Sequence, residues 1–127
     1  MYSFSTKVSG SYDEVLAKTI DALKAEGFGI ITEIDIRETM KKKLDIEKLP
    51  YKILGACNPG LANQALEADP DIGLLLPCNV VVREEQDGSV TVAFMDPVAV
   101  LGLTDKSEIE QLARDVRSKL ERVRDAL

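Results

Sequence analysis

The sequence predicts an α+β domain, a two-layer sandwich in which helices pack on a sheet of about five strands. Two features of the pattern support this fold class. Segments with an apolar residue at every second position alternate with segments whose apolar residues recur every three or four positions, as strands and amphipathic helices require. The last two predicted strands flank Asp87-Gly88, a strong hairpin signal. The predicted order of elements is β-α-β-α-β-α-β-β-α. Because a hairpin does not belong to a purely parallel sheet, an α+β sandwich fits this order better than a doubly wound fold.

Length and composition indicate a single globular domain that spans residues 1–127. Hydrophobic residues make up 45% of the chain and charged residues 30%, which is typical of a folded protein and not of a disordered one. A chain of this length buries roughly two-thirds of its unfolded surface, so its core needs neither disulfides nor a metal. No internal repeat or linker divides the sequence.

The first two predicted strands enclose a helix with clear start and stop signals. Alternation over residues 2–8 predicts a strand whose aromatic face is turned inward. Ser11 and Glu14 have the spacing of a capping box, and the helix that they open should end at Gly27. Residues 28–34 are rich in β-branched residues and predict a second strand, antiparallel to the first or reached by a crossover.

Caps and prolines delimit the next elements. Asp35 resembles an N-cap and opens a second helix, which carries a run of lysines and should end before Pro50. Residues 51–57 are compact and apolar and predict a third strand. The next residues, Asn58-Pro59, are an N-cap and a favoured first helical residue, so they should open a third helix that Asp69-Pro70-Asp71 closes.

The rest of the chain is expected to supply two more strands and a last helix. Residues 73–83 form a long apolar segment, and Pro77 in its middle implies an edge, a bulge or a break. Its second half, residues 80–82, is a run of valines that predicts burial on both faces of the sheet. The returning strand covers residues 90–94, and apolar residues at helical spacing then continue over residues 109–127.

The chain contains no histidine, and this absence excludes several kinds of site. Ser-His and Cys-His nucleophile pairs, histidine-ligated zinc and an imidazole proton shuttle all require that side chain. An enzyme with this sequence would have to work with Cys, Asp, Glu, Lys, Tyr or backbone groups.

The charge balance disfavours polyanionic partners. Lys and Arg number 16 against 22 Asp and Glu, so the net charge is −6 at pH 7 and we expect no binding of nucleic acid. The main basic concentration, Lys41-Lys42-Lys43 with Lys48 and Lys52, also contains Asp45 and Glu47. We interpret it as a solvated helix face.

The expected location is the cytoplasm. The apolar stretches are too short to span a bilayer, and no signal peptide is visible at the N-terminus. We therefore expect no membrane partner, and we expect both cysteines to be free thiols in a reducing compartment.

Two Cys-Asn dipeptides, Cys57-Asn58 and Cys78-Asn79, are the most distinctive candidates for a site. Each lies at a predicted strand end or strand break. If the third and fourth strands are neighbours, the two thiols should meet near Asp96, at the end of the fifth strand. Cys57 precedes a predicted helix N-terminus, where the helix dipole stabilises a thiolate. We therefore expect Cys57 to have a lowered pKa and to react faster than Cys78.

Each of these residues also has a purely structural interpretation. Free cysteine is among the most buried residue types and behaves as a small hydrophobe. Asn58 is an ordinary N-cap, Asn79 satisfies backbone groups where Pro77 interrupts pairing, and Asp96-Pro97 ends a strand.

The same positions carry a resemblance to a known family. The segments YKILGACNP (residues 51–59) and LLLPCNVVV (residues 74–82), followed by Asp96-Pro97, resemble the small bacterial and archaeal family called domain of unknown function 302, and so do Glu33-Ile34-Asp35 and the lysine-rich helix. The likeness covers essentially the whole chain. It implies an α+β domain and a homodimer with no established activity. The family's shared Cys-Asn and Asp-Pro positions correspond to the two Cys-Asn dipeptides and to Asp96-Pro97.

These observations favour a cytoplasmic homodimer that binds a small ligand or a partner in a groove lined by Cys57, Asn58, Cys78, Asn79 and Asp96. One alternative is a thiol-dependent redox or transfer enzyme with Cys57 as reactive thiolate, Cys78 as resolving thiol and Asp96 as a candidate base. A second alternative is a metal or haem held by the thiolates of two subunits. The sequence identifies no cofactor, and it predicts no metal site within one chain.

Overall fold

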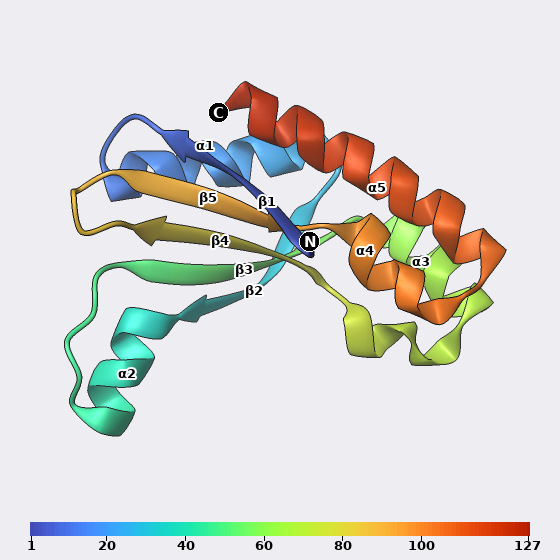
Figure 1. Ribbon diagram of the computed structural model, residues 1–127, viewed down its shortest axis with the longest axis horizontal. Coiled ribbons are helices and arrows are strands. Elements are labelled where there is room, and N and C mark those ends of the chain that lie inside the picture. The colour runs from blue at the N-terminus through green and yellow to red at the C-terminus, as the bar shows by residue number, and fades with distance from the viewer.

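The computed structural model describes residues 1–127 and contains one antiparallel sheet with the strand order β1-β5-β4-β3-β2 (Figure 1). The predicted α+β class is confirmed, and the predicted elements follow one another in the expected order. Strand bounds are β1 (Ser3–Val8), β2 (Gly29–Asp35), β3 (Tyr51–Cys57), β4 (Cys78–Glu84) and β5 (Val90–Met95).

Five α-helices and two short 3₁₀ helices connect or follow the strands. The α-helices are α1 (Tyr12–Ala25), α2 (Ile36–Leu44), α3 (Pro59–Ala68), α4 (Pro97–Leu101) and α5 (Ser107–Ala126). The 3₁₀ helices are η1 (Pro70–Leu75) and η2 (Gly102–Thr104). None of these helices is both long and apolar enough to cross a membrane.

Side-chain caps fix where several of the helices begin. The side chains of Ser11, Asp35 and Asn58 accept hydrogen bonds from backbone N–H groups in the first turns of α1, α2 and α3, as the sequence predicts. Asp96 does the same for α4, where the sequence predicts only the end of a strand. These local bonds set the point at which each strand turns into the next helix.

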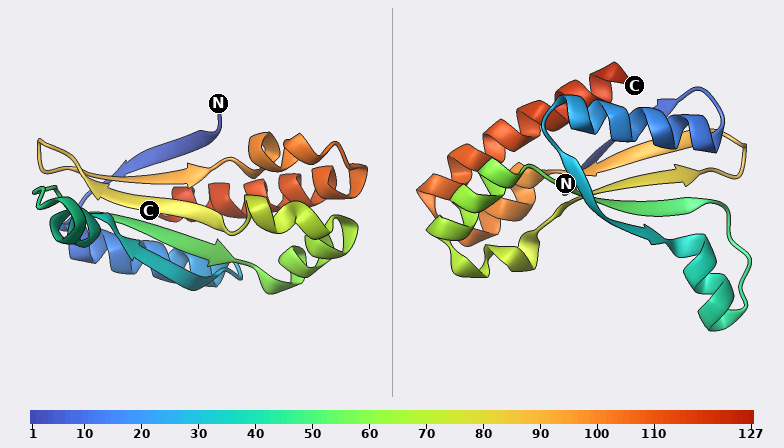
Figure 2. Two further views of the ribbon diagram at one scale, coloured as in Figure 1. Left: turned by 90° about the horizontal axis from the view of Figure 1, so that it is seen from below. Right: turned by 180° about the vertical axis from the view of Figure 1, so that it is seen from behind.

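The main core lies between one face of the sheet and the pair α1 and α5, which cover that face (Figure 2). Val80, Val82, Val92 and Phe94 point to this side of β4 and β5 and are almost fully buried. They pack in one cluster with Leu120 and other apolar residues of the two helices. Each such side chain stabilises the fold by about 1.5–3 kcal/mol through burial.

A second, smaller core lies beyond one end of the strands, where α3, η1, α4 and the first half of α5 meet (Figure 2). Its buried residues include Ile72, Leu101 and Ile109. We call residues 59–75 the α3–η1 lobe. The α2 arm, residues 36–50, extends from the opposite end of the sheet, and every residue from Lys41 to Leu49 is exposed.

β2 lies at the edge of the sheet far from β1 and pairs with β3, so the predicted alternative in which the chain crosses over between the first two strands is confirmed. The structure corrects three expectations from the sequence. Tyr2 is 75% exposed, because β1 begins only at Ser3. Val81 is half-buried, because no helix covers its face of the sheet. Residues 73–75 belong to the 3₁₀ helix η1 and not to a strand, because Asp69 caps that helix by accepting a hydrogen bond from the N–H of residue 71.

Candidate ligand cavity lined by both cysteines

A cavity of about 320 Å³ lies where the ends of β3 and β4 meet the α3–η1 lobe. Its walls come from segments far apart in the sequence, and none of its 16 lining residues is charged. The lining is almost entirely apolar, and its larger members are Phe28, Ile31, Leu61, Leu66, Leu76, Leu101, Leu112 and Val116. The cavity is therefore suited to apolar contents.

Both cysteines of the chain line this cavity. β3 and β4 are antiparallel neighbours with Ala56 directly opposite Cys78, so Cys57 at the end of β3 lies beside Cys78 at the start of β4. Both are free thiols, Cys57 half-buried and Cys78 buried. The sequence predicts that the two thiols meet if the third and fourth strands are neighbours. β3 and β4 are neighbours in the sheet.

The Cys78 thiol is neutral at physiological pH. Burial raises its pKa to about 11, and the negative charge of a Cys57 thiolate would act in the same direction. A neutral Cys78 is a weak donor and a poor nucleophile. The buried end of the cavity thus offers no charge to a ligand.

Asn58 supports the cavity wall at the start of α3. Its Oδ1 accepts a hydrogen bond from the Leu61 N–H at 3.3 Å. Its Nδ2 lies against Gly27, so close that a Cβ at Gly27 would be 3.0 Å from it. Gly27 has a positive φ of 87° and closes α1. Asn58 therefore holds the first turn of α3 against the end of α1, and it is also one of the cavity's few polar groups.

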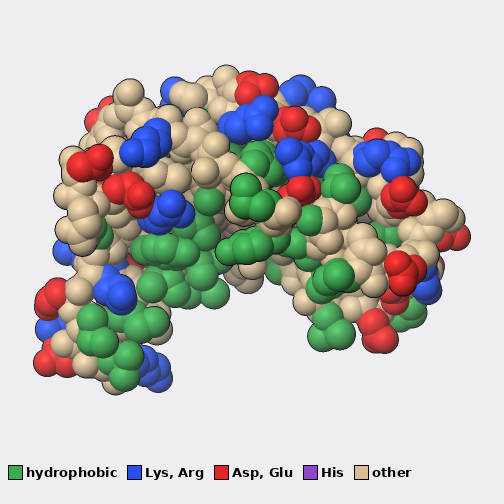
Figure 3. All heavy atoms as spheres, viewed as in Figure 1, with side chains coloured by type: hydrophobic (Ala, Val, Ile, Leu, Met, Phe, Trp, Pro, Cys, Tyr) green, Lys and Arg blue, Asp and Glu red, His purple; other side chains and the backbone are tan.

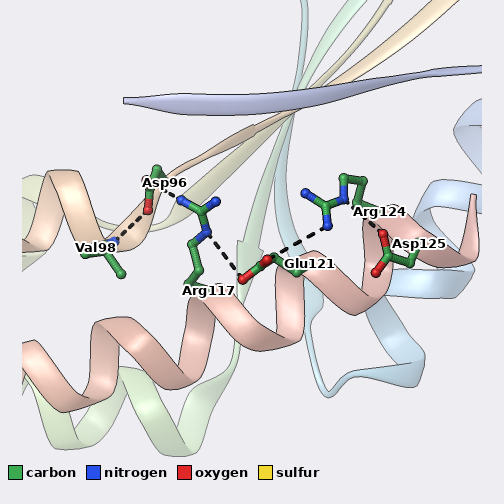
Figure 4. A network of polar contacts seen from close by, with 6 residues as sticks. All are labelled: Asp96, Val98, Arg117, Glu121, Arg124 and Asp125. Carbon is green, nitrogen blue, oxygen red and sulfur yellow. Dashed lines mark hydrogen bonds and ion pairs between the residues drawn. The ribbon is translucent and has the colours of Figure 1, made fainter. Parts of the chain in front are cut away.

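Two of the predicted site residues lie outside the cavity. Asn79 follows Cys78 on β4, so strand alternation turns it to the opposite face, where it is exposed. Asp96 is held elsewhere: its Oδ1 accepts from the Val98 N–H at 2.9 Å, and its Oδ2 accepts from Arg117 of α5 (Figure 4). The structure brings together Cys57, Asn58 and Cys78, but not Asn79 or Asp96.

Comparison with known proteins identifies the family. Residues 4–127 match the family model described as Domain of unknown function DUF302. The chain belongs to the DUF302 family. It is also similar to the crystal structure of an uncharacterized conserved protein DUF302 from Bacillus stearothermophilus, with a TM-score of 0.91 and 27% identity over 99% of this chain and 98% of that one. No functionally curated protein matches the sequence. The resemblance predicted from the two Cys-Asn segments is therefore confirmed.

Sequence reasoning missed most of the cavity of this DUF302 protein. Leu61, Leu76 and Leu112 line it from three different segments. In the sequence they are ordinary apolar residues at helix or strand spacing, and nothing distinguishes a residue that lines a cavity from one that fills a core. The Cys-Asn dipeptides were the one local signal that pointed to this region.

The structure contains no cluster of three or more His, Cys, Asp or Glu side chains placed to hold a metal ion. Cys57 and Cys78 together provide two thiolate ligands, half of a tetrahedral zinc set. A thiolate metal centre in this DUF302 protein would therefore need two further ligands from a second subunit.

Proposed function

We propose that this DUF302 protein is a binding module that takes a neutral, apolar small molecule into the cavity beside β3 and β4. The observation that carries the proposal is the apolar cavity of about 320 Å³ without a charged lining residue. Ligand sites in proteins are concave, mostly apolar and furnished with few polar groups, and they have volumes of about 300–1,000 Å³. Cys57, Asn58 and Cys78 are the polar groups here.

The lining restricts the chemistry of the ligand. A charged ligand would lose its hydration in the cavity and find no counter-charge, which costs several kcal/mol. Thiols form only weak hydrogen bonds, and the Oδ1 of Asn58 already accepts from Leu61. The expected ligand is therefore neutral and carries at most one hydrogen-bonding group, placed near Asn58.

Binding of a neutral fluorescent probe, N-phenyl-1-naphthylamine, tests this proposal. We expect saturable binding with one probe per chain. Ala62 lines the cavity, so Ala62→Phe should fill it and weaken binding at least about tenfold, or 1.4 kcal/mol. The matched control is Ala99→Phe on the exposed side of α4, which should bind as the wild type does. No saturable binding, or equal binding by both variants, would overturn the proposal.

A thiol-dependent redox or transfer enzyme is the second candidate, because both thiols line one cavity. In that mechanism Cys57, the more accessible thiol, attacks first and Cys78 resolves the product. Asp96 does not serve as the base in this arrangement, since it binds Arg117 outside the cavity. A metal or haem shared by thiolates of two subunits stays a prediction from the sequence, which metal analysis and the absorption spectrum of the purified protein test.

We also propose that the protein acts as a cytoplasmic homodimer. The cytoplasmic location is supported by two cysteines that stand free even though they line one cavity, as expected in a reducing compartment. The homodimer is supported by a face of the sheet that no helix covers, on which apolar side chains such as Ile53 and Val81 lie.

A further inference from the structure

The face of the sheet that α1 and α5 leave open carries an apolar row. Strand register places Ile34 beside Ile53, Ile53 beside Val81, and Val81 beside Ala93, so the row crosses β2, β3, β4 and β5. Strand alternation turns all four side chains away from the main core. None of them belongs to either core cluster, and all are half-buried or exposed.

The row is part of a larger hollow. Tyr2, Tyr51 and Met95 extend it as lining residues of a shallow depression on the same face, whose polar lining residues are Ser3, Asn79 and Arg83. Figure 3 shows hydrophobic side chains gathered in the concave surface between the α2 arm and the α3–η1 lobe. The open face of an antiparallel sheet is ordinarily polar, and a contiguous apolar surface marks an interaction site.

The two projections that flank this hollow lie at opposite ends of the sheet (Figures 1 and 2). The α2 arm leads into the start of β3, and η1 leads into the start of β4. Because β3 and β4 are antiparallel, their starting ends point in opposite directions. The apolar row crosses the strands, and it therefore lies between the arm at one end of the sheet and the lobe at the other.

The α2 arm is positively charged. It contains five basic and three acidic residues in a chain whose net charge is −6. Lys41 and Lys42 form ion pairs within the arm, but Arg37, Lys43 and Lys48 have no ion-pair partner. Leu44 and Ile46 on the same arm are 61% and 42% exposed.

The opposite projection is negatively charged. Residues 53–82 contain no Lys or Arg at all. Their acidic residues, Glu67, Asp69 and Asp71, all lie in the α3–η1 lobe and form no ion pair within the chain. Leu74 on this lobe is 85% exposed. Three bases without partners at one end of the hollow thus have three acids without partners at the other.

We propose that a second copy of this chain binds the open face of the sheet. In this dimer the open faces of the two sheets oppose each other, and the two-fold axis lies between them, perpendicular to the strands. This axis places the α2 arm of each copy against the α3–η1 lobe of the other. In such an isologous interface each contact occurs twice, so both sets of unpaired charges find partners while the apolar rows bury each other. The inference rests on the homodimer of the proposed function and is independent of the ligand cavity.

Sedimentation velocity from nanomolar to high-micromolar concentration tests the interface. Ile53→Asp should raise the dimer Kd at least about tenfold, because it places a charge in the apolar row. The control, Ala17→Asp on the exposed side of α1, should not change it. Circular dichroism verifies that each variant folds. If Ile53→Asp does not fold, the charge variants described next test the interface instead. They change only exposed side chains and should therefore leave folding intact.

Charge reversal tests the pairing of arm and lobe. Lys43→Glu with Lys48→Glu, or Glu67→Lys with Asp71→Lys, should each weaken the homodimer, and mixing the two doubly substituted proteins should restore a heterodimer. Added salt should weaken the wild-type dimer. Lys24→Glu on α1 is the control and should have no effect. A chain that stays monomeric at every concentration overturns the homodimer and this interface together. A dimer that none of these substitutions weakens leaves the homodimer standing and overturns the interface.

Discussion

Arg117 in the middle of α5 donates a hydrogen bond to the carboxylate of Asp96, and that carboxylate also caps α4 (Figure 4). The Asp96 side chain is only 12% exposed and that of Arg117 30%. The guanidinium lies 4.5 Å from the centre of the Phe4 ring, which stacks on Phe94. One ion pair therefore joins the end of β5, the start of α4, α5 and β1.

Removing the Asp96 carboxylate should destabilise the protein. Asp96→Ala removes an N-cap and leaves Arg117 without this partner, so we expect the free energy of unfolding to fall by about 2–3 kcal/mol in urea titrations. Arg114→Ala is the control, because Arg114 pairs with Glu110 on the exposed face of the same helix. That pair should be worth less than about 0.5 kcal/mol. Equal losses in the two variants would contradict a structural role for Asp96.

Gly55 in β3 should tolerate no side chain. A Cβ at this position would lie 2.1 Å from Thr32 Oγ1 and 2.9 Å from Pro77 Cγ, so Gly55→Ala must displace both neighbours. We expect a loss of about 1–3 kcal/mol in thermal or urea unfolding. Thr32→Ala in the same chain should recover part of the loss, because it removes the nearest atom. Gly102→Ala, where nothing lies within 4 Å of the added Cβ, serves as the control.

The Cys78 thiol should make stability fall at alkaline pH. Its pKa rises from 9.0 to about 11 on folding, so the folded state binds this proton more tightly than the unfolded chain does. The contribution is complete below pH 9 and is lost as the pH rises toward 11. The difference corresponds to roughly 3 kcal/mol.

Urea unfolding of the wild type and Cys78→Ala between pH 7 and 10.5 measures this contribution. The variant should show a flatter dependence on pH across the upper part of that range. Tyr12, whose pKa burial raises to about 12, is present in both proteins and cancels in the comparison. Parallel curves would show that Cys78 titrates alike in the folded and unfolded chains.

The two cysteines should differ in reactivity toward iodoacetamide. Cys57 is half-buried, whereas Cys78 is 6% exposed and its raised pKa keeps it neutral. We expect native protein at pH 8 to be alkylated at Cys57 at least about tenfold faster than at Cys78, because the thiolate is the nucleophile. Peptide mass spectrometry reads both positions, and the urea-unfolded protein, where the two rates should converge, is the control. If both thiols react only after unfolding, the thiol-dependent enzyme is excluded.

Thr91 in β5 offers a substitution that should stabilise the fold. Its hydroxyl is buried and has no hydrogen-bond partner. Thr91→Val keeps the shape and removes the unpaired group, so the free energy of unfolding should rise by about 1 kcal/mol. Thr19→Val is the comparison, because the buried Thr19 hydroxyl donates to the Val15 carbonyl at 2.7 Å and its loss should bring no gain. A decrease in stability for Thr91→Val would mean that the hydroxyl has a partner in solution.

Most elements of this fold could be predicted because their signals are local. Ser11, Asp35 and Asn58 each bond a backbone N–H within the first helical turn that follows, so the cap and its effect lie three residues apart. Asp87-Gly88 fixes the β4–β5 hairpin in the same way, with a positive φ of 86° at Gly88. The prediction of a strand from residue 73 onward is wrong for the residues before β4. The Asp69 cap and Pro70 start a 3₁₀ helix there, and an apolar segment is compatible with either a strand or a 3₁₀ helix.

The candidate site was only partly accessible to sequence reasoning. Cys57 and Cys78 were singled out, but their approach depends on the pairing of β3 with β4, which no local pattern specifies. Asn79 was grouped with Cys78 although adjacent strand residues point to opposite faces. Asp96 was grouped with the thiols because its partner, Arg117, lies on another element.

The fold class, the positions of the caps and turns, the family and the exclusion of histidine chemistry follow from the amino-acid sequence, because each depends on residue identity or on contacts within a few residues. Three features became visible only in the folded chain: β2 is an edge strand, the two thiols share an uncharged cavity, and an apolar row lies on the open face between oppositely charged projections. Strand pairing and burial depend on free energies summed over residues that are distant in the chain. A valine at position 81 has the same local preference whether or not a helix comes to cover it.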